Sequence, residues 1–321
     1  MKEKRIENKT SRTAEFTCMI RAASFYEKRP PYKSNDYIAP KILPKFMVPI
    51  AKTGALRYFF KNRLNFPKDV PKGMYEYVIA RTKFIDSVFQ KAVSSKFDQI
   101  LIFGAGFDSR GIRFADLNKK AKHSKPLVSM PQNSTNFVRI FELDSPLTQE
   151  AKINQFKKRG IELNPNVIFI SIDFNTESLE DKLIDSGFKE NKKSLFILEG
   201  LTMYLDPEAI DSTFHIIDKF AGEGSEVVFD YVYSSVLRGE NLYYGESDIL
   251  KQVNDAKEPW SFGIEKGELE SFLKDRNLKL VCSLNSEDLE DKFFKIDGNK
   301  VAKVNGTHCI VHAKKPNVFC G

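Results

Sequence analysis

Residues 100–110 read ILIFGAGFDSR, a short apolar run that passes directly into a Gly-x-Gly turn. A continuous apolar run bounded by glycine is typical of a strand buried on both faces of a parallel sheet. Because neither Gly104 nor Gly106 carries a Cβ atom, the backbone there can approach a ligand closely. A tight turn that needs positive φ explains the motif equally well. Ser109 replaces the third glycine of a dinucleotide fingerprint, which disfavours a nicotinamide or flavin enzyme.

The rest of the chain repeats this strand pattern. Apolar runs of similar length lie at residues 137–143, 167–172, 194–198, 226–229, 278–282 and 309–312. Segments of helical length lie between most of them, at residues 146–159, 179–186, 207–220 and 266–276. Strands that alternate with helices predict a doubly wound, Rossmann-like α/β fold with a seven-stranded, mostly parallel sheet. The last two strands have no obvious helix between them, which predicts an antiparallel last strand.

Acidic residues follow three further strands at their carboxyl ends. Glu142 and Asp144 end the second strand, Asp173 ends the third, and Glu199 ends the fourth. A carboxylate after the second strand can accept hydrogen bonds from both ribose hydroxyls of an adenosine ligand, although it can also cap the next helix. Asp173 could accept from the adenine amino group while Phe174 covers the ring. Because ligands of open α/β sheets bind at the carboxyl ends of the strands, the series predicts a nucleotide-type site.

The segments outside these strands predict a cap and a lid. Residues 1–96 contain helical stretches at 13–26, 42–60 and 73–92, and we expect a helical N-terminal cap there. Residues 97–321 then form the Rossmann-like core, within a single domain over residues 1–321. Residues 231–264 are long for a connection and predict a lid insertion. The polar, lysine-rich stretch 118–136 predicts an exposed loop.

Aromatic side chains in the predicted lid are candidates for a substrate pocket. They are Tyr231, Tyr233, Tyr243, Tyr244, Trp260 and Phe262. Aromatic residues between a sheet and a cap are, however, equally ordinary core residues. The histidines lie outside the strand-end motifs, and we predict structural or surface roles for all of them: His123, His215, His308 and His312.

Composition restricts the class of protein. The 321 residues include 50 basic and 43 acidic side chains, a net charge of +7 that indicates solubility rather than a nucleic-acid surface. The four cysteines are scattered without a C-x-x-C pair, so neither a metal site nor a disulfide framework is expected, which fits a cytoplasmic protein. No stretch approaches the roughly 18 apolar residues of a membrane span, so we expect no membrane partner.

Taken in order, the motifs resemble those of the leucine carboxyl methyltransferases and their prokaryotic relatives, a branch of the class I S-adenosylmethionine-dependent methyltransferases. The resemblance covers most of the chain and is more specific than any single motif. It includes residues 11–14 (SRTA), 21–22 (RA), 81–86 (RTKFID), 104–110 (GAGFDSR), 142–146 (ELDSP), 173–174 (DF), 199–204 (EGLTMY) and 258–264 (EPWSFGI). The chain departs from the family in its longer 118–136 loop and in having glycine at position 111.

The resemblance implies which residues bind the methionine and ribose parts of the cofactor, S-adenosylmethionine. Gly104, Ala105 and Gly106 would line its methionine part through backbone contacts. Asp144 would bind the ribose hydroxyls, with Glu142 as the second candidate. These are expectations from the matching positions of the family motif.

The same resemblance implies roles at the remaining positions. Asp173 and Phe174 would contact adenine, and Glu199 would lie beside the ammonium group of the cofactor. Arg81 would form a pair of hydrogen bonds with a carboxylate of the cofactor or the substrate. Tyr204 would lie on the substrate side, where it is the candidate for handling a proton.

The implied activity is O-methyl transfer to a carboxylate, or a hydroxyl, of a small molecule or a protein C-terminus. Transfer from a sulfonium is an in-line displacement, so the enzyme mainly positions the acceptor. A carboxylate is ionised at neutral pH and needs no general base, and the lack of histidine in the motifs favours it. Two alternatives remain: a tRNA-modifying methyltransferase of the same fold, and a non-catalytic protein that binds an adenosine ligand.

Overall fold

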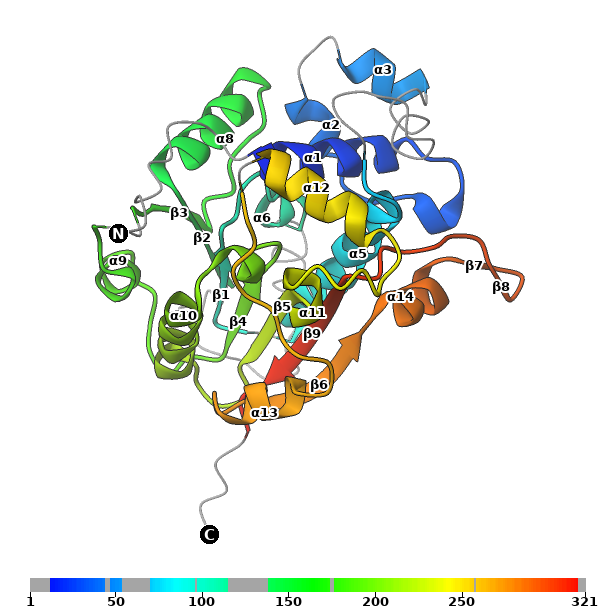
Figure 1. Cartoon of the computed structure of the whole chain (residues 1–321). Coiled ribbons are helices and arrows are strands. Elements are labelled where there is room, and N and C mark those ends of the chain that lie inside the picture. The colour runs from blue at the N-terminus through cyan, green and yellow to red at the C-terminus, as the bar shows by residue number, and fades with distance from the viewer. Residues whose placement is uncertain are drawn as a thin grey trace, which may run out of the picture.

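A seven-stranded sheet forms the centre of the protein (Figure 1). The structure, a computed structural model, describes residues 12–43, 47–53, 70–95, 97–114, 138–173, 176–256 and 258–316. The strands are β1 (Gln99–Phe103), β2 (Arg139–Asp144), β3 (Val167–Ser171), β4 (Ser194–Leu198), β5 (Glu226–Val232), β6 (Lys279–Leu284) and β9 (His308–Lys314), in the order β3-β2-β1-β4-β5-β9-β6. Strand β9 runs antiparallel to both of its neighbours, β5 and β6, and the other neighbouring pairs are parallel, which confirms the predicted fold class.

The strand order places a topological switch beside β1. The chain goes from β1 to β2 and β3 on one side and returns as β4 on the other. Phe103, the last residue of β1, pairs with Leu143 in β2 and with Leu198 in β4. The residues that follow these positions therefore meet at one edge of the sheet, which is where open α/β sheets bind ligands.

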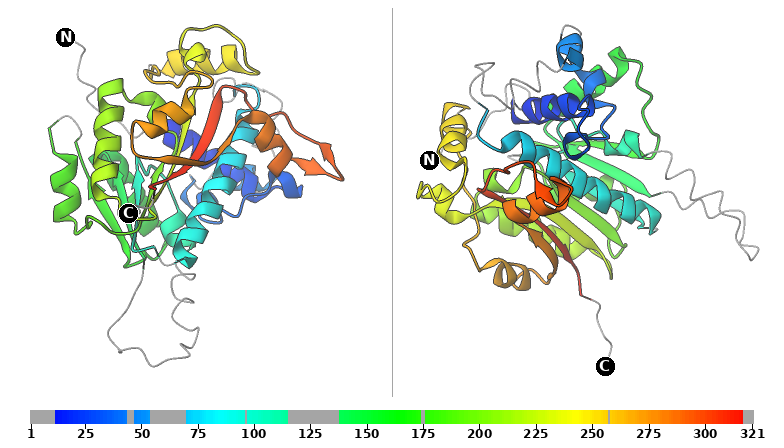
Figure 2. Two further views of the ribbon diagram at one scale, coloured as in Figure 1. Left: turned by 90° about the horizontal axis from the view of Figure 1, so that it is seen from below. Right: turned by 90° about the vertical axis from the view of Figure 1, so that its right-hand side faces the viewer.

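Helices cover both faces of the sheet (Figures 1 and 2). One face packs on α9 (Leu179–Asp185), α10 (Pro207–Phe220) and α13 (Leu269–Lys274), and its core includes Leu101 and Phe103. The other packs on α1 (Arg12–Phe25) and α5 (Met74–Ser94), with α8 (Pro146–Lys158) adding Phe156, and its core includes Ile100 and Ile102. Successive residues of β1 thus point into different cores, as the continuous apolar run predicts.

The helical stretches predicted before β1 are present in part. After α1 come η1 (Pro30–Tyr32), α2 (Ala39–Ile42), α3 (Met47–Thr53) and α5. Within the helical stretch predicted at residues 42–60, α2 ends at Ile42 and α3 covers Met47–Thr53, so the described part is helical in separate pieces. Residues 54–60 and the predicted loop at 118–136 lie outside the described residues.

The connection between the last two strands differs from the prediction. Between β6 and β9 the chain forms α14 (Ser286–Phe293) and a small hairpin of β7 (Lys295–Ile296) and β8 (Asn299–Lys300). The helix begins with a capping box: the Asn285 side chain accepts from the backbone of Asp288, whose side chain accepts from Asn285 N–H. This signal was present in the sequence and was missed.

The predicted lid segment contains two helices. They are α11 (Ser234–Leu237) and α12 (Glu246–Ala256), which follow β5 directly. Two other short elements follow the strand ends, α6 (Arg110–Arg113) after β1 and η2 (Thr202–Tyr204) after β4. None of the helices in the described part of the chain is both long and apolar enough to cross a membrane.

Gly111 in α6 is required by close packing between α6 and the sheet. A Cβ atom at this position would lie 2.6 Å from Cγ2 of Val167 in β3 and 3.2 Å from Oε1 of Glu142 in β2. Such a separation is far inside van der Waals contact, so a larger residue would push α6 away from the strands. Because α6 continues from the Gly-x-Gly turn, this packing also fixes the turn.

We predict that Gly111→Ala lowers the free energy of unfolding by about 1–3 kcal/mol, because overpacking forces the backbone to shift. Urea denaturation would measure the change. In a Val167→Ala background, which lacks the clashing methyl groups, the same substitution should cost less. An equal cost in both backgrounds would show that contact with Val167 is not the reason for the glycine.

Candidate active site

The Gly-x-Gly turn is hydrogen bonded to the end of β2. Oδ2 of Asp144 accepts from the backbone N–H of Gly106 at 2.5 Å, and Oδ1 accepts from Ser145 N–H at 2.7 Å. Gly104 and Gly106 have φ angles of 58° and 48°, which favour glycine. A Cβ atom on Gly106 would lie 3.0 Å from that of Ala14 in α1. The turn with positive φ expected from the sequence is therefore present, and the close packing at Gly106 is against α1, whereas close approach of the backbone to a ligand stays a prediction.

The two acidic residues of β2 occupy different environments. Glu142 is buried and forms an ion pair with the equally buried Lys152 of α8. Burial raises the pKa of Glu142 to about 7, although Lys152 opposes the shift. Asp144 is half-buried beside the Gly-x-Gly turn. A carboxylate has about four acceptor positions, so Asp144 can accept from a ligand as well as from the backbone. This geometry favours Asp144 over Glu142 as the ribose-binding residue.

Asp173 follows β3 at the same edge of the sheet. It is half-buried, and its backbone N–H donates to Oε2 of Glu177 at 2.9 Å. The neighbouring Ile172 N–H donates to the carbonyl of Asp144 at 3.0 Å, which ties the two strand ends together. Phe174, predicted to cover an adenine ring, lies outside the described residues.

Arg81 of α5 is paired with two carboxylates. Its Nε donates to Oε1 of Glu199 at 3.0 Å, and its Nη1 donates to Oδ2 of Asp230 at 2.7 Å. Within the described ranges Nη2 has no hydrogen-bond partner. A guanidinium has five N–H donors and these two bonds use two of them, so the predicted pair of hydrogen bonds from Arg81 to a ligand carboxylate stays a prediction.

Asp230 is a site residue that sequence reasoning missed. It is completely buried in β5, and it also accepts from Tyr77 Oη at 2.8 Å and from Gly200 N–H at 2.6 Å. Burial alone would raise the pKa of Asp230, but Arg81 and the hydrogen bonds lower it below its ordinary value. An acidic residue inside an apolar run, as in VVFDYV at residues 227–232, was the available signal.

Glu199 belongs to a larger set of buried ion pairs. Its Oε2 accepts from Nη1 of Arg110 at 2.7 Å, and Nε of Arg110 donates to Oδ1 of Asp86 at 2.8 Å. We call the connected residues the buried charge network: Arg21, Asp36, Arg81, Asp86, Asp108, Arg110, Arg113, Glu199 and Asp230. The network joins α1 and α5 to the Gly-x-Gly turn and to the ends of β4 and β5.

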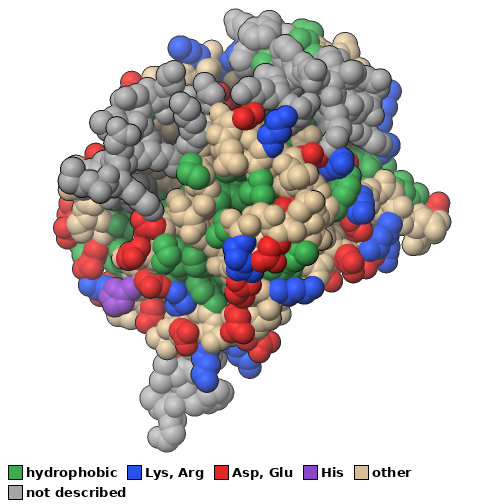
Figure 3. Space-filling view, in the orientation of Figure 1, with side chains coloured by type: hydrophobic (Ala, Val, Ile, Leu, Met, Phe, Trp, Pro, Cys, Tyr) green, Lys and Arg blue, Asp and Glu red, His purple; other side chains and the backbone are tan. Residues whose placement is uncertain are grey.

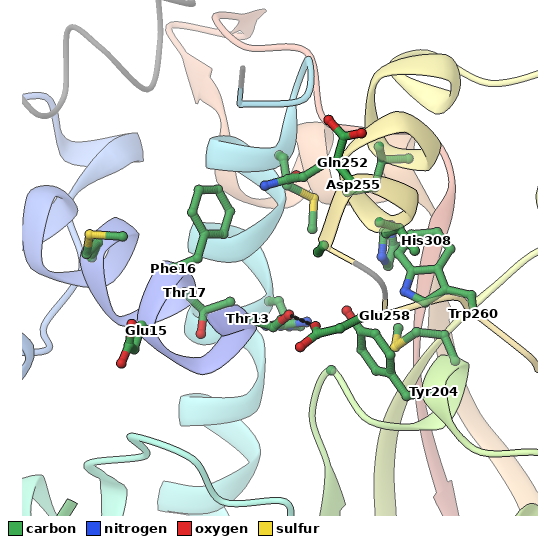
Figure 4. A pocket seen from close by; sticks show the side chains of 18 residues that line it. Thr13, Glu15, Phe16, Thr17, Tyr204, Gln252, Asp255, Glu258, Trp260 and His308 are labelled. Atoms are coloured by element: carbon green, nitrogen blue, oxygen red, sulfur yellow. Dashed lines mark hydrogen bonds between the residues drawn. The ribbon is translucent and has the colours of Figure 1, made fainter. Parts of the chain in front are cut away.

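A cavity of about 410 Å³ lies next to this network (Figure 4). Arg81 and Gly200 form part of its wall, so it adjoins Glu199. Most of its other side chains come from α1, η2, α12 and the segment after α12, and they include Thr13, Phe16, Met19, Met203, Tyr204, Val253, Glu258 and Trp260. Oγ1 of Thr13 donates to Oε2 of Glu258 at 2.7 Å, which connects α1 to the predicted lid segment.

Tyr204 lines the cavity, where its ring packs edge-on against Trp260 with centroids 6.4 Å apart. Burial raises the pKa of Tyr204 above its ordinary value, although contacts with Trp260 and Thr13 oppose the shift. The phenol therefore stays protonated at neutral pH and is suited to donating a hydrogen bond. Its predicted place on the substrate side and its role in proton handling both stay predictions.

The aromatic residues of the predicted lid separate into core and cavity. Of the six, Trp260 alone appears among the described residues of the cavity wall. Tyr233 stacks on Tyr243 and packs edge-on against Tyr231, and Phe262 packs on Phe272 in the core.

One histidine lies where no ligand contact was predicted. His308 lines the cavity, because β9 is antiparallel and its first residue pairs with Val232 at the carboxyl end of β5. His312 instead pairs with Glu226, at 2.7 Å from Nε2 to Oε2, and His123 lies outside the described residues. The structural role predicted for His308 is thus incomplete, since its ring also faces the cavity.

The buried charge network predicts acid sensitivity. Burial would raise the pKa of Asp36, Asp108 and Asp230, but their arginine partners lower it, in Asp108 to about 2. A lowered pKa in the folded state adds stability that is present above the unfolded value of about 3.9. This stability is lost as the pH falls toward about 2.

We therefore expect the free energy of unfolding, measured with urea, to fall steeply as the pH is lowered from about 5 to about 3. Asp230→Asn should flatten this dependence, whereas Asp185→Asn at an exposed position should leave it unchanged. If Asp230→Asn kept the wild-type pH dependence, Asp230 would not be a charged member of the network.

Known proteins were compared with this chain and with its fold. A protein of Bacillus subtilis, named as an S-adenosyl-L-methionine-dependent methyltransferase, is 24% identical over 96% of this chain and 99% of its own length. A relative of that name from Mycolicibacterium paratuberculosis is 32% identical, over 47% of this chain and 44% of that protein. The chain thus spans about half the length of this mycobacterial relative.

Solved structures share the fold. A protein of Thermobifida fusca named as a methyltransferase superposes with a TM-score of 0.54 over 95% of this chain and 98% of its own, at 12% identity. A DUF574-family protein from Streptomyces avermitilis has the same TM-score, with 10% identity over 97% of this chain and 100% of that one. The family model of the leucine carboxyl methyltransferases matches residues 16–218, from α1 to α10. The chain therefore belongs to the leucine carboxyl methyltransferase family.

Proposed function

We propose that the protein is an S-adenosylmethionine-dependent O-methyltransferase, with its acceptor held in the cavity between α1 and α12. S-adenosylmethionine, the donor named for the relatives, supplies a methyl group activated by a cationic sulfur. The in-line displacement then requires that acceptor and donor be positioned together. The donor would lie at the strand ends and the acceptor in the adjoining cavity.

The residues at the strand ends have the chemistry that this donor needs. Gly104 and Gly106 would contact the methionine part through their backbone, since neither carries a side chain. Asp144 would accept from the ribose hydroxyls and Asp173 from the adenine amino group. Glu199, whose side chain remains 15% exposed despite its two arginine partners, would accept from the donor ammonium group.

The observation that carries the proposal is the shared wall between the two sites. Gly200 and Arg81 line the cavity, and Gly200 directly follows Glu199. The backbone N–H of Gly200 is held by Asp230, and a Cβ atom there would lie 3.1 Å from Nη1 of Arg81. An acceptor in the cavity and a donor on Glu199 would therefore meet across one rigid turn.

The cavity suits a compact acceptor rather than a nucleic acid. Its walls include the apolar side chains Phe16, Met19, Met203 and Val253, as is usual for small-molecule sites. On the face seen in Figure 3, acidic and basic side chains are intermixed. A tRNA-modifying enzyme needs a continuous basic surface that leads to the site, so this face does not favour that alternative.

We predict that Asp144→Ala weakens S-adenosylmethionine binding by about 10- to 100-fold, since hydrogen bonds to a charged group contribute about 1.5–3 kcal/mol. Isothermal titration calorimetry would measure the affinity. Glu142→Gln is the matched control in the same strand: it should keep the affinity, but lower stability by leaving buried Lys152 unpaired. Loss of binding in Glu142→Gln, with Asp144→Ala unchanged, would reverse the assignment.

The activity itself is tested with S-adenosylmethionine that carries a labelled methyl group. Small carboxylates, small alcohols and peptides with a free C-terminus would be offered as acceptors, with bulk tRNA as a separate arm. We expect label on at least one oxygen acceptor, and mild base separates labile esters from stable ethers. Label on tRNA alone, or none on any acceptor while the donor binds, would contradict the proposal.

A further inference from the structure

The cavity wall contains a histidine, His308, whose two ring nitrogens have different surroundings. His308 is 98% buried, with 2% of its surface exposed, and packs against Tyr77 and Trp260 at ring-centroid distances of 4.5 and 5.3 Å. Its Nδ1 lies 2.7 Å from Oγ1 of Thr307. Nε2 has no hydrogen-bond partner within the described residues, and the ring lines the cavity.

A chain of hydrogen bonds fixes which nitrogen carries the proton. Nδ2 of Asn305 donates to the carbonyl of Lys72 at 2.9 Å, so Oδ1 is the acceptor end of the amide. Thr307 Oγ1 donates its only hydrogen to that Oδ1 at 2.5 Å. Oγ1 must therefore accept from Nδ1–H of His308. Nε2 is left with a lone pair, and burial lowers the pKa of His308 to about 3, so the ring is neutral.

The indole N–H of Trp260 lies beside the imidazole ring of His308. Nε1–H of Trp260 is buried and makes no hydrogen bond of good geometry within the described residues, although it lies near the hydroxyl of Tyr204. Trp260 packs edge-on against His308, with an angle of 88° between the rings. The wall thus offers one donor and one acceptor on adjacent rings. A hydroxyl can satisfy both groups, whereas a carboxylate has no proton for Nε2.

The charges around the cavity also favour a neutral hydroxyl over a carboxylate as the acceptor group. Arg81 is the only cationic side chain among the described residues of its wall, and Glu199 and Asp230 already pair with it. The wall also contains three carboxylates, Glu15, Asp255 and Glu258. An anionic acceptor would need an available cation to offset its desolvation, whereas a neutral hydroxyl needs none.

We propose, building on the function above, that the acceptor is a neutral, compact and largely apolar phenol or alcohol, and that Nε2 of His308 receives its hydroxyl proton. The acceptor oxygen forms a bond to the methyl carbon as the carbon–sulfur bond breaks, and that electron pair stays on sulfur. The proton moves from oxygen to Nε2 and later to water. Positive charge passes from sulfur to the imidazole, so the net charge of the site is conserved during transfer. This replaces the carboxylate favoured by the sequence.

The hydrogen-bond chain is tested without catalysis. Proton–nitrogen correlation spectra of protein with ¹⁵N-labelled histidine should show His308 as the Nδ1–H tautomer. Thr307→Val should shift its signals toward the Nε2–H tautomer, whereas Thr307→Ser should keep the wild-type spectrum. A wild-type signal for Nε2–H would overturn the proposal, because that nitrogen could not accept a proton.

Matched pairs of acceptors test the substrate class. We would use 2-naphthol with 2-naphthoate, and 1-octanol with octanoate, together with labelled S-adenosylmethionine. Transfer to a hydroxyl member at least about tenfold faster than to its carboxylate is expected, because the carboxylate has no proton for Nε2 and would meet no available cation in the cavity. His308→Asn should lower kcat for the hydroxyl by about 100-fold with the donor affinity retained. Should that variant not fold, Thr307→Val against Thr307→Ser supplies the same comparison.

The two proposals fail in different ways. If the wild-type protein does not bind S-adenosylmethionine in calorimetry, the proposed function fails. If it binds the donor but methylates the carboxylates faster, methylates neither member of either pair, or is unaffected by His308→Asn, only the acceptor assignment is overturned.

Discussion

Buried arginines impose the constraint on which the rest of the site depends. Arg110 is wholly buried and Arg81 nearly so, and a guanidinium cannot lose its charge in a protein. Each must therefore meet carboxylates, because an unpaired buried ion costs several kcal/mol. Asp86 on α5, Glu199 after β4 and Asp230 in β5 supply them. Replacing such pairs with apolar residues is often neutral, so their main effect here is to fix geometry.

This geometry explains how one turn serves two sites. Glu199 faces the Gly-x-Gly turn through Arg110, and Gly200 faces the cavity beside Arg81. The same network reaches α1 through Arg21, whose guanidinium also donates to the carbonyl of Phe107 at 2.7 Å. The helix that covers the turn and supplies Thr13 and Phe16 to the cavity is thus held by charges at the strand ends.

The strands and the Gly-x-Gly site were predictable because their signals are local. Each strand is a short apolar run, and Gly104, Asp144 and Glu199 each follow a run directly. Asp230 and His308 could not be recognised in this way, because their places in the site depend on contacts between distant segments. Asp230 contacts Arg81, which lies 149 positions earlier in the chain. His308 reached the site because β9 is antiparallel, which moves its first residue to the ligand-binding edge. Because the antiparallel last strand was itself predicted, the position of His308 at this edge was also predictable from the sequence.

The central claim, that the strand ends form a site for a methyl donor, is tested most directly by calorimetric titration of the wild-type protein. S-adenosylmethionine, S-adenosylhomocysteine and NAD would be titrated separately under identical conditions. We predict saturable binding of the first two, with no heat from NAD, because Ser109 replaces the third glycine of the dinucleotide fingerprint. Binding of NAD without either adenosylated ligand would contradict it.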